Sequence, residues 1–233
     1  MLEHVCTSGP GRVAVQSRLP AVKSLLQAIL KEWHFCTEPG PANQTVALVE
    51  QGQVPPDGVR HTLWFTPKPF DTASQLALPL SLTALYHALQ CWFFPAPRRY
   101  LRLPLDQPAQ LELRGASLNG RLISLSERGG RVAVPVLLSN GEMLQLTVQL
   151  DGYLLATAAQ VIYTIPAGDL PGGQPPQAGL LFRPLPPQLG EAIHHHVERS
   201  LVERACRQVG LASDDPALGW FDTVAAPWAK LPA

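Results

Sequence analysis

The hydrophobic pattern of the chain changes near residue 102, and this change constrains the fold more than any other sequence feature. Before residue 102, short apolar runs alternate with longer segments in which apolar residues recur at helical spacing. After it, apolar and polar residues alternate in several short segments separated by Gly-containing turns. Since helices repeat every 3.6 residues and strands every 2, the sequence predicts an α/β domain followed by an antiparallel β domain.

The first half predicts a small parallel sheet with helical crossovers. The expected strands are Arg12–Ser17, Thr45–Val49 and His61–Phe65, and the expected helices are Leu19–Trp33 and Leu80–Phe94. Strands that alternate with helices in this way favour an α/β domain with a parallel-type sheet.

The second half predicts an antiparallel β-barrel that ends in a helix. The expected strands are Leu111–Arg114, Arg121–Ser124, Arg131–Val134, Met143–Leu150, Tyr153–Ile165 (one bent strand or two short ones) and Leu180–Phe182. A helix is expected over Leu189–Val209, with Gly210 as its C-cap. Its expected inner face consists of Ile193, Val197, Leu201, Val202 and Ala205.

These patterns divide the chain into four parts: residues 1–94 as the α/β domain, 95–102 as a junction, 103–212 as the barrel with its helix, and 213–233 as a tail rich in Pro and Ala. The tail carries Trp220, Phe221 and Trp228, so we expect it to dock onto the rest of the protein.

Composition excludes several classes of function. The 233 residues include 18 basic and 18 acidic side chains, and this balance argues against DNA or RNA as a partner. The four cysteines are scattered without a Cys-x-x-Cys pair, so no zinc site is expected. No Gly-x-Ser-x-Gly, His-Glu-x-x-His or P-loop pattern occurs, and we therefore expect no catalytic residues and no enzyme activity.

The sequence also bears on location. The first residues lack the basic and apolar regions of a signal peptide. The longest apolar stretch, Leu76–Phe94, is interrupted by polar residues and is too polar to predict a membrane span. We therefore expect a cytoplasmic protein.

Two short motifs carry the chemistry. The expected junction contains three arginines in a stretch of five residues, namely Arg98, Arg99 and Arg102. We call these three residues the arginine motif. Guanidinium groups match phosphate oxygens and the O6/N7 edge of guanine. The segment Ser124–Gly129 adds hydroxyl groups and a glycine turn. Together the motifs are suited to bind a small guanine nucleotide, whereas the arginine motif alone is more typical of a solvated linker.

The run His194-His195-His196 suggests a metal site but does not predict one. Consecutive residues of a helix point about 100° apart, so these three side chains cannot converge on one ion. We expect them to face solvent and predict no metal ligand.

The two motifs and the strand pattern resemble the PilZ family of bacterial cyclic di-GMP receptors over about residues 95–207. Arg98 and Arg102 match the family's Arg-x-x-x-Arg, and Ser126 and Gly129 match its Asp/Asn-x-Ser-x-x-Gly. The resemblance implies cyclic di-GMP as the ligand and no further cofactor. It implies that Arg98 and Arg102 contact phosphates and guanine edges with help from Arg99, that Ser126 hydrogen-bonds the ligand, and that Gly129 lets the backbone turn close to it.

Ser124 departs from the family pattern, because it stands where Asp or Asn is expected. A carboxylate or amide there can accept from guanine N1–H and N2–H, whereas a hydroxyl is shorter and neutral. Two hypotheses stay open. In the first, the protein binds cyclic di-GMP and regulates motility, pilus function or exopolysaccharide production, and hence biofilm formation, through a protein partner. In the second, the barrel is a degenerate interaction module that binds no nucleotide.

The N-terminal domain resembles a response-regulator receiver in its β/α alternation and in Lys68-Pro69-Phe70 after a strand. It departs from that family because no acidic pair follows the first strand at Ser17 and because Val49-Glu50 ends the second strand. We therefore expect a pseudo-receiver without a phosphoacceptor.

Overall fold

The computed structural model describes residues 11–38, 40–41, 44–59, 61–68, 74–150, 152–212 and 214–222. They form two compact units. The N-terminal unit comprises the described residues up to Leu101 and those from Glu198 onward, and the barrel unit comprises those within Arg102–Val197. The chain passes from one unit to the other after Leu101 and again after Val197, and the second point lies inside the helix Pro187–Val209. The domain limits that we expect from the sequence stay a prediction.

The N-terminal unit contains a four-stranded sheet in which all neighbouring strands are parallel, as predicted. Its strands, in spatial order, are β1 (Arg12–Gln16), β2 (Thr45–Glu50), β3 (His61–Thr66) and β4 (Gln75–Ala77). The sequence pattern did not predict β4, because three residues are too few to show a period of two. Every residue of β2 is buried, which is typical of a parallel strand inside a sheet.

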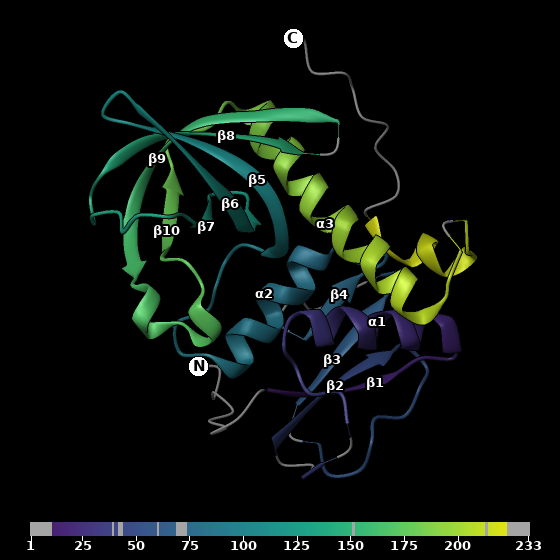
Figure 1. Cartoon of the computed structure of the whole chain (residues 1–233). Helices are drawn as coiled ribbons and strands as arrows, with labels where there is room; N and C mark the ends of the chain where they lie inside the picture. The colour runs from purple at the N-terminus through teal and green to yellow at the C-terminus, as the bar shows by residue number, and fades with distance from the viewer. Residues whose placement is uncertain are drawn as a thin grey trace. The chain divides into compact units, whose positions relative to one another are not determined.

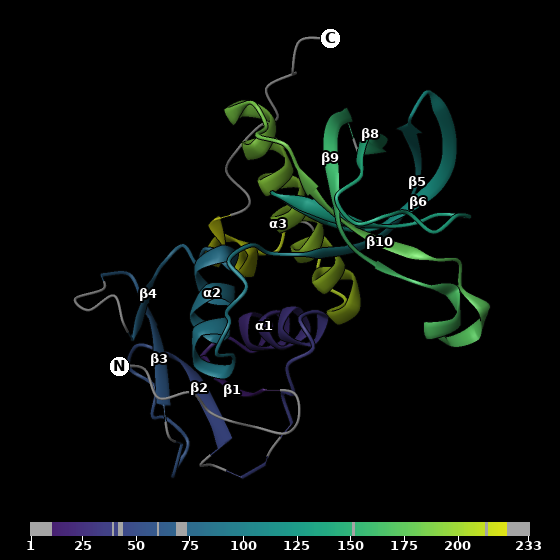
Figure 2. The ribbon, with the colours of Figure 1, turned by 90° about the vertical axis from the view of Figure 1, so that its left-hand side faces the viewer.

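Helices α1 (Pro20–Glu32) and α2 (Leu82–Phe93) belong to the same unit and lie close together (Figures 1 and 2). The ring of Trp33, the C-cap residue of α1, meets the ring of Tyr86 in α2 edge to face, with centroids 5.1 Å apart. The apolar side chains on one face of α1 are all buried: Val22, Leu25, Leu26, Ile29 and Leu30.

A buried carboxylate ties the end of β2 to the residues that follow β1. Glu50, 2% exposed, accepts hydrogen bonds from the Ser17 hydroxyl and from the backbone N–H and Nε of Arg18, each at 2.8 Å. Burial raises the pKa of Glu50, but the bonds from Arg18 and Ser17 and the Arg18 charge outweigh it, so the pKa lies below its ordinary value. Glu50 is therefore a structural anchor of the sheet.

The resemblance of this unit to a receiver domain stays a prediction. Of the residues that suggested it, Pro69 and Phe70 lie outside the described residues.

The barrel unit is a closed barrel of six antiparallel strands, as predicted (Figure 1). The strands are β5 (Leu103–Leu113), β6 (Ala116–Ser126), β7 (Gly129–Ala133), β8 (Met143–Leu150), β9 (Tyr153–Ile165) and β10 (Gln177–Phe182). Their order around the barrel is β10-β7-β6-β5-β8-β9. Of the two alternatives for Tyr153–Ile165, the structure has one continuous strand. Two short 3₁₀ turns, η2 (Ala167–Asp169) and η3 (Pro171–Gly173), precede β10.

The barrel interior is filled by apolar side chains from all six strands. In β8, for example, buried residues alternate with exposed or half-buried ones along the whole strand. The buried side chains of the strands include Leu111, Leu122, Leu125, Val132, Leu146, Val148, Leu155, Val161 and Leu180. This apolar interior gives the six strands a common core.

Helix α3 (Pro187–Val209) follows the barrel, and Gly210 after it has a φ of 72°, as expected of a helix C-cap. All five residues predicted for its inner face are buried. In the short 3₁₀ helix η4 (Pro216–Trp220), the ring of Trp220 contacts that of Phe65, with centroids 6.0 Å apart, and Phe221 is buried. Trp228 lies outside the described residues. None of the helices in the described ranges is both long and apolar enough to cross a membrane.

Candidate ligand-binding site

The segment Ser124–Gly129 forms the end of the β6–β7 hairpin. Ser126 pairs with Gly129 across the hairpin, and its hydroxyl donates to the Gly129 carbonyl at 3.1 Å. A Cβ atom at position 129 would lie 2.1 Å from the Leu180 carbonyl oxygen in β10, so only glycine fits there without displacing backbone. Ser126 and Gly129 therefore stabilise the shape of the turn, independently of any ligand.

A β-bulge in β6 decides which side chains face outward. The register between β6 and β7 shifts by one residue between Leu122 and Ser124. Leu122 and Leu125 are both fully buried although they are three residues apart. An extra residue in one strand makes this possible, because it interrupts the alternation of faces. The bulge thus lies at Ile123.

Beyond the bulge, Ser124 and Ser126 lie on the face of the strand opposite to Leu125, which we call the outer face of the barrel. Each serine is only 8% exposed. The structure therefore brings Ser124, Ser126 and Gly129 together on one outer surface.

Arg102 lies beside these residues because of the β5–β6 register. Pro104 pairs with Ser124 in this antiparallel ladder. Continuing the register by two residues on each strand places Arg102, the residue just before β5, opposite Ser126. Arg102 is exposed and shares the outer face with Pro104. The two sequence motifs thus meet in space through Arg102 and Ser126.

Arg98 and Arg99 belong to the N-terminal unit. The backbone N–H of Arg98 donates to Oε1 of the buried Gln90 at 3.2 Å, and the Arg99 guanidinium lies 5.7 Å from the centroid of the Tyr100 ring. Both arginines are exposed. The guanidinium groups of Arg98 and Arg102 make no hydrogen bond or ion pair with any other described residue, so their donors are available to an anion.

Arg131 is a residue of this surface that the sequence motifs did not single out. It pairs directly with Ser124 across β6 and β7 and therefore shares its outer face. Its Nε is buried and has no hydrogen-bond partner in the described part of the chain. The only signal in the sequence was its position two residues after Gly129. Arg131 lies opposite Ser124 because of the bulge, and the hydrophobic pattern of the sequence does not reveal that bulge.

A row of five cross-strand neighbours crosses the outer face at this level, namely Pro104, Ser124, Arg131, Gly179 and Tyr163. A Cβ atom at Gly179 would lie 2.1 Å from Cε1 of Tyr163. The Tyr163 ring therefore fills the space that a side chain at position 179 would occupy, directly beside Arg131.

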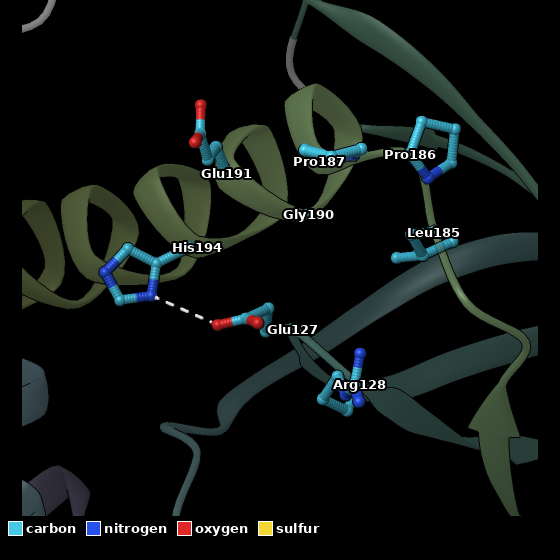
Figure 3. A pocket seen from close by; sticks show the side chains of 8 residues that line it. All are labelled: Glu127, Arg128, Leu185, Pro186, Pro187, Gly190, Glu191 and His194. Carbon is cyan, nitrogen blue, oxygen red and sulfur yellow. Dashed lines mark ion pairs between the residues drawn. The ribbon is translucent and has the colours of Figure 1, made fainter.

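A cavity of about 410 Å³ adjoins the hairpin turn (Figure 3). Its lining includes Glu127 and Arg128 from the turn and Gly190 and His194 from the first turns of α3. Oε2 of Glu127 lies 3.7 Å from Nδ1 of His194. This distance is longer than a hydrogen bond, so the contact is a weak, partly exposed ion pair when His194 is protonated.

The three histidines of α3 have different surroundings, and the expectation that all face solvent was wrong for His196. His195 is exposed, whereas His196 is buried and its ring meets Tyr153 edge to face at 5.9 Å. Residue 196 is three positions after the buried Ile193, so it shares the inner face of the helix. Among the described residues, no group of three or more His, Cys, Asp or Glu side chains is placed to share a metal ion.

Comparison with known proteins finds a family match for one part of the chain, the segment that carries the two motifs. Residues 96–199 match the family model of the PilZ domain, which confirms the resemblance seen in the sequence. No curated protein matches the sequence.

Several solved structures are similar to about half of this chain. MotI (DgrA), an inhibitor of motility from Bacillus subtilis, is 16% identical with a TM-score of 0.43, over 47% of this chain and 53% of that one. The PilZ domain of YcgR from Escherichia coli with c-di-GMP is 19% identical with a TM-score of 0.40, over 50% of this chain and 100% of that one. A longer YcgR chain in complex with c-di-GMP is 22% identical with a TM-score of 0.39, over 51% of each chain. The match thus spans about half the length of MotI and of the longer YcgR chain.

Proposed function

We propose, with the PilZ domain of residues 96–199 as the premise, that this protein is a cytoplasmic, non-enzymatic effector that binds cyclic di-GMP. The observation that carries the proposal is the position of Arg102 opposite Ser126 on the outer face of the barrel. This position brings the Arg102 guanidinium onto the same surface as the Ser126 hydroxyl and Gly129.

The chemistry of this surface suits a cyclic dinucleotide. Arg102 supplies a planar set of donors with no partner among the described residues, which matches phosphate oxygens. Gly129 lets β7 pack against the Leu180 carbonyl, and in the proposed site the backbone of the turn that it allows runs close to the ligand. Arg98 and Arg99 bind the same ligand from the junction, and Ser126 hydrogen-bonds it.

Ligand binding at the junction also supplies a regulatory step. Arg98 and Arg99 belong to the N-terminal unit, whereas Arg102 belongs to the barrel unit. A ligand that contacts all three favours the arrangement of the units in which they converge. We propose that this reorientation of the N-terminal unit passes the signal to a protein partner and regulates motility, pilus function or exopolysaccharide production.

Isothermal titration calorimetry of the whole chain with cyclic di-GMP tests the proposal. We expect saturable binding at ligand concentrations on the order of tens of micromolar or lower. No binding heat in that range would reject the proposal. It would favour the second candidate, a PilZ-like interaction module without a nucleotide ligand, to which the neutral Ser124 lends support.

A further inference from the structure

Arg131 combines two observations that the two motifs leave unexplained. Its Nε is buried without a hydrogen-bond partner, and no described residue forms an ion pair with its guanidinium. Buried polar atoms in folded proteins nearly always have a partner, so an isolated one calls for a ligand or another specific cause. The residue directly opposite, Ser124, has no charge with which to balance Arg131.

We propose that Arg131 is a further ligand-binding residue, whose guanidinium donates to the O6 and N7 acceptors of one guanine of cyclic di-GMP. The inference rests on the proposed function and assigns to the same site a residue outside both motifs. It gives the site a way to read guanine that needs no carboxylate at position 124, because Arg131 recognises the acceptor edge of the base and not its N–H groups.

The surroundings of Arg131 favour a base over a phosphate. The flat side chains of Pro104 and Tyr163 lie at the two ends of its cross-strand row. A phosphate brought against a buried nitrogen would lose much of its hydration, whereas a neutral base loses far less. Arg102 lies two residues along the strands and two strands across from Arg131, roughly 12 Å away by strand spacing, and is exposed. The exposed arginine therefore takes the phosphate and the half-buried Arg131 takes the base edge.

Calorimetry with two ligands tests this assignment. The ligands are cyclic di-GMP and its 7-deaza analogue, in which a C–H group replaces the N7 acceptor. We expect the wild-type chain to bind the natural ligand at least about fivefold more tightly than the analogue. Arg131→Gln should bind both ligands with the same, weaker affinity. Arg131→Lys keeps the charge but loses the planar fork, so it should also lose the preference for N7.

Arg114→Gln is the matched control. Arg114 is a 79%-exposed arginine of the same barrel unit, in the turn between β5 and β6, where it pairs with Glu142, and its change removes one positive charge without touching the outer-face row. It should leave both affinities unchanged. Thermal unfolding of each variant separates lost binding from lost folding.

The outcomes separate the two proposals. If the wild-type chain binds neither ligand, the proposed function fails and this inference with it. If the wild type binds but Arg131→Gln lowers both affinities by the same factor, Arg131 contacts a phosphate and the assignment to the base edge is wrong. If Arg131→Gln changes neither affinity, Arg131 is not a ligand residue.

Position 124 offers an independent variant. In Ser124→Asp the new carboxylate would lie directly opposite Arg131 and pair with its guanidinium. We expect this variant to fold at least as stably as wild type and to lose the preference for N7, because the Arg131 donors are then occupied. A retained N7 preference in Ser124→Asp would overturn the assignment.

Discussion

Arg102 lies opposite Ser126 in the continued register of β5 and β6, on the outer face of the barrel. The two residues come from motifs more than twenty positions apart in sequence, and the hairpin of β5 and β6 makes them neighbours. The barrel therefore builds one half of the candidate site by strand pairing alone. Arg98 and Arg99 reach it from the junction in the proposed complex.

Loss of an arginine from the motif should weaken ligand binding. A hydrogen bond to a charged group contributes roughly 1.5–3 kcal/mol, so Arg102→Ala and Arg98→Ala should each lower the affinity for cyclic di-GMP about tenfold or more. Isothermal titration calorimetry measures the effect. Arg114→Gln controls for the loss of one positive charge, and an unchanged affinity in Arg102→Ala would contradict the site as described.

Removal of the Ser126 hydroxyl should loosen the hairpin turn. Its hydrogen bond to the Gly129 carbonyl is buried, so Ser126→Ala should lower the free energy of unfolding by about 1 kcal/mol. Urea denaturation measures this change. Ser117→Ala is the control, because the Ser117 hydroxyl accepts from Gln110 at the exposed end of β6 and its loss should cost less. Equal effects in the two variants would argue against a structural role for Ser126.

Two glycines of the barrel unit should respond in opposite directions to the same change. At Gly129 a new Cβ would meet the Leu180 carbonyl, so Gly129→Ala should destabilise the fold by about 1–3 kcal/mol or more. At Gly190, inside α3, a new Cβ would meet no atom within 4 Å beyond its chain neighbours and the helix backbone, and Gly190→Ala should stabilise the helix by roughly 0.5–1 kcal/mol. Denaturant unfolding of both variants checks the pair. A stable Gly129→Ala protein would show that β7 and β10 can separate at this point.

The Glu50 anchor should make stability depend on pH in the acid range. The pKa of Glu50 is lower in the folded chain than its ordinary value of 4.5. Its contribution is therefore fully present above about pH 4.5 and is lost as the pH falls through the lower, folded pKa. Glu50→Gln removes the charge at all pH values. Thermal unfolding from pH 3 to 7 should show wild type more stable than Glu50→Gln at pH 7, with the difference shrinking below pH 4.5. A difference that is constant with pH would mean that the charge of Glu50 contributes nothing.

Local sequence pattern predicted most of the elements, for a physical reason. Helix α1 and strand β8 each show their own period clearly, because one face of each is buried along its whole length. The three-residue strand β4 was not predicted, because it is too short to show a period. The burial of His196 was not predicted either, because a histidine in a polar run does not indicate that its side chain packs in the core.

The sequence by itself determined the order of the elements, the two motifs and the departure at Ser124, since these depend on residue identity and local periodicity. Only the tertiary structure decided which faces those residues occupy. With strict alternation, Leu122, Ser124 and Ser126 would share one face of β6, and the serines would point into the barrel. The bulge at Ile123 turns them outward and places Arg131 opposite Ser124. A shift of one residue between strands reverses every side chain beyond it, and its position depends on pairing with strands that are distant in the sequence.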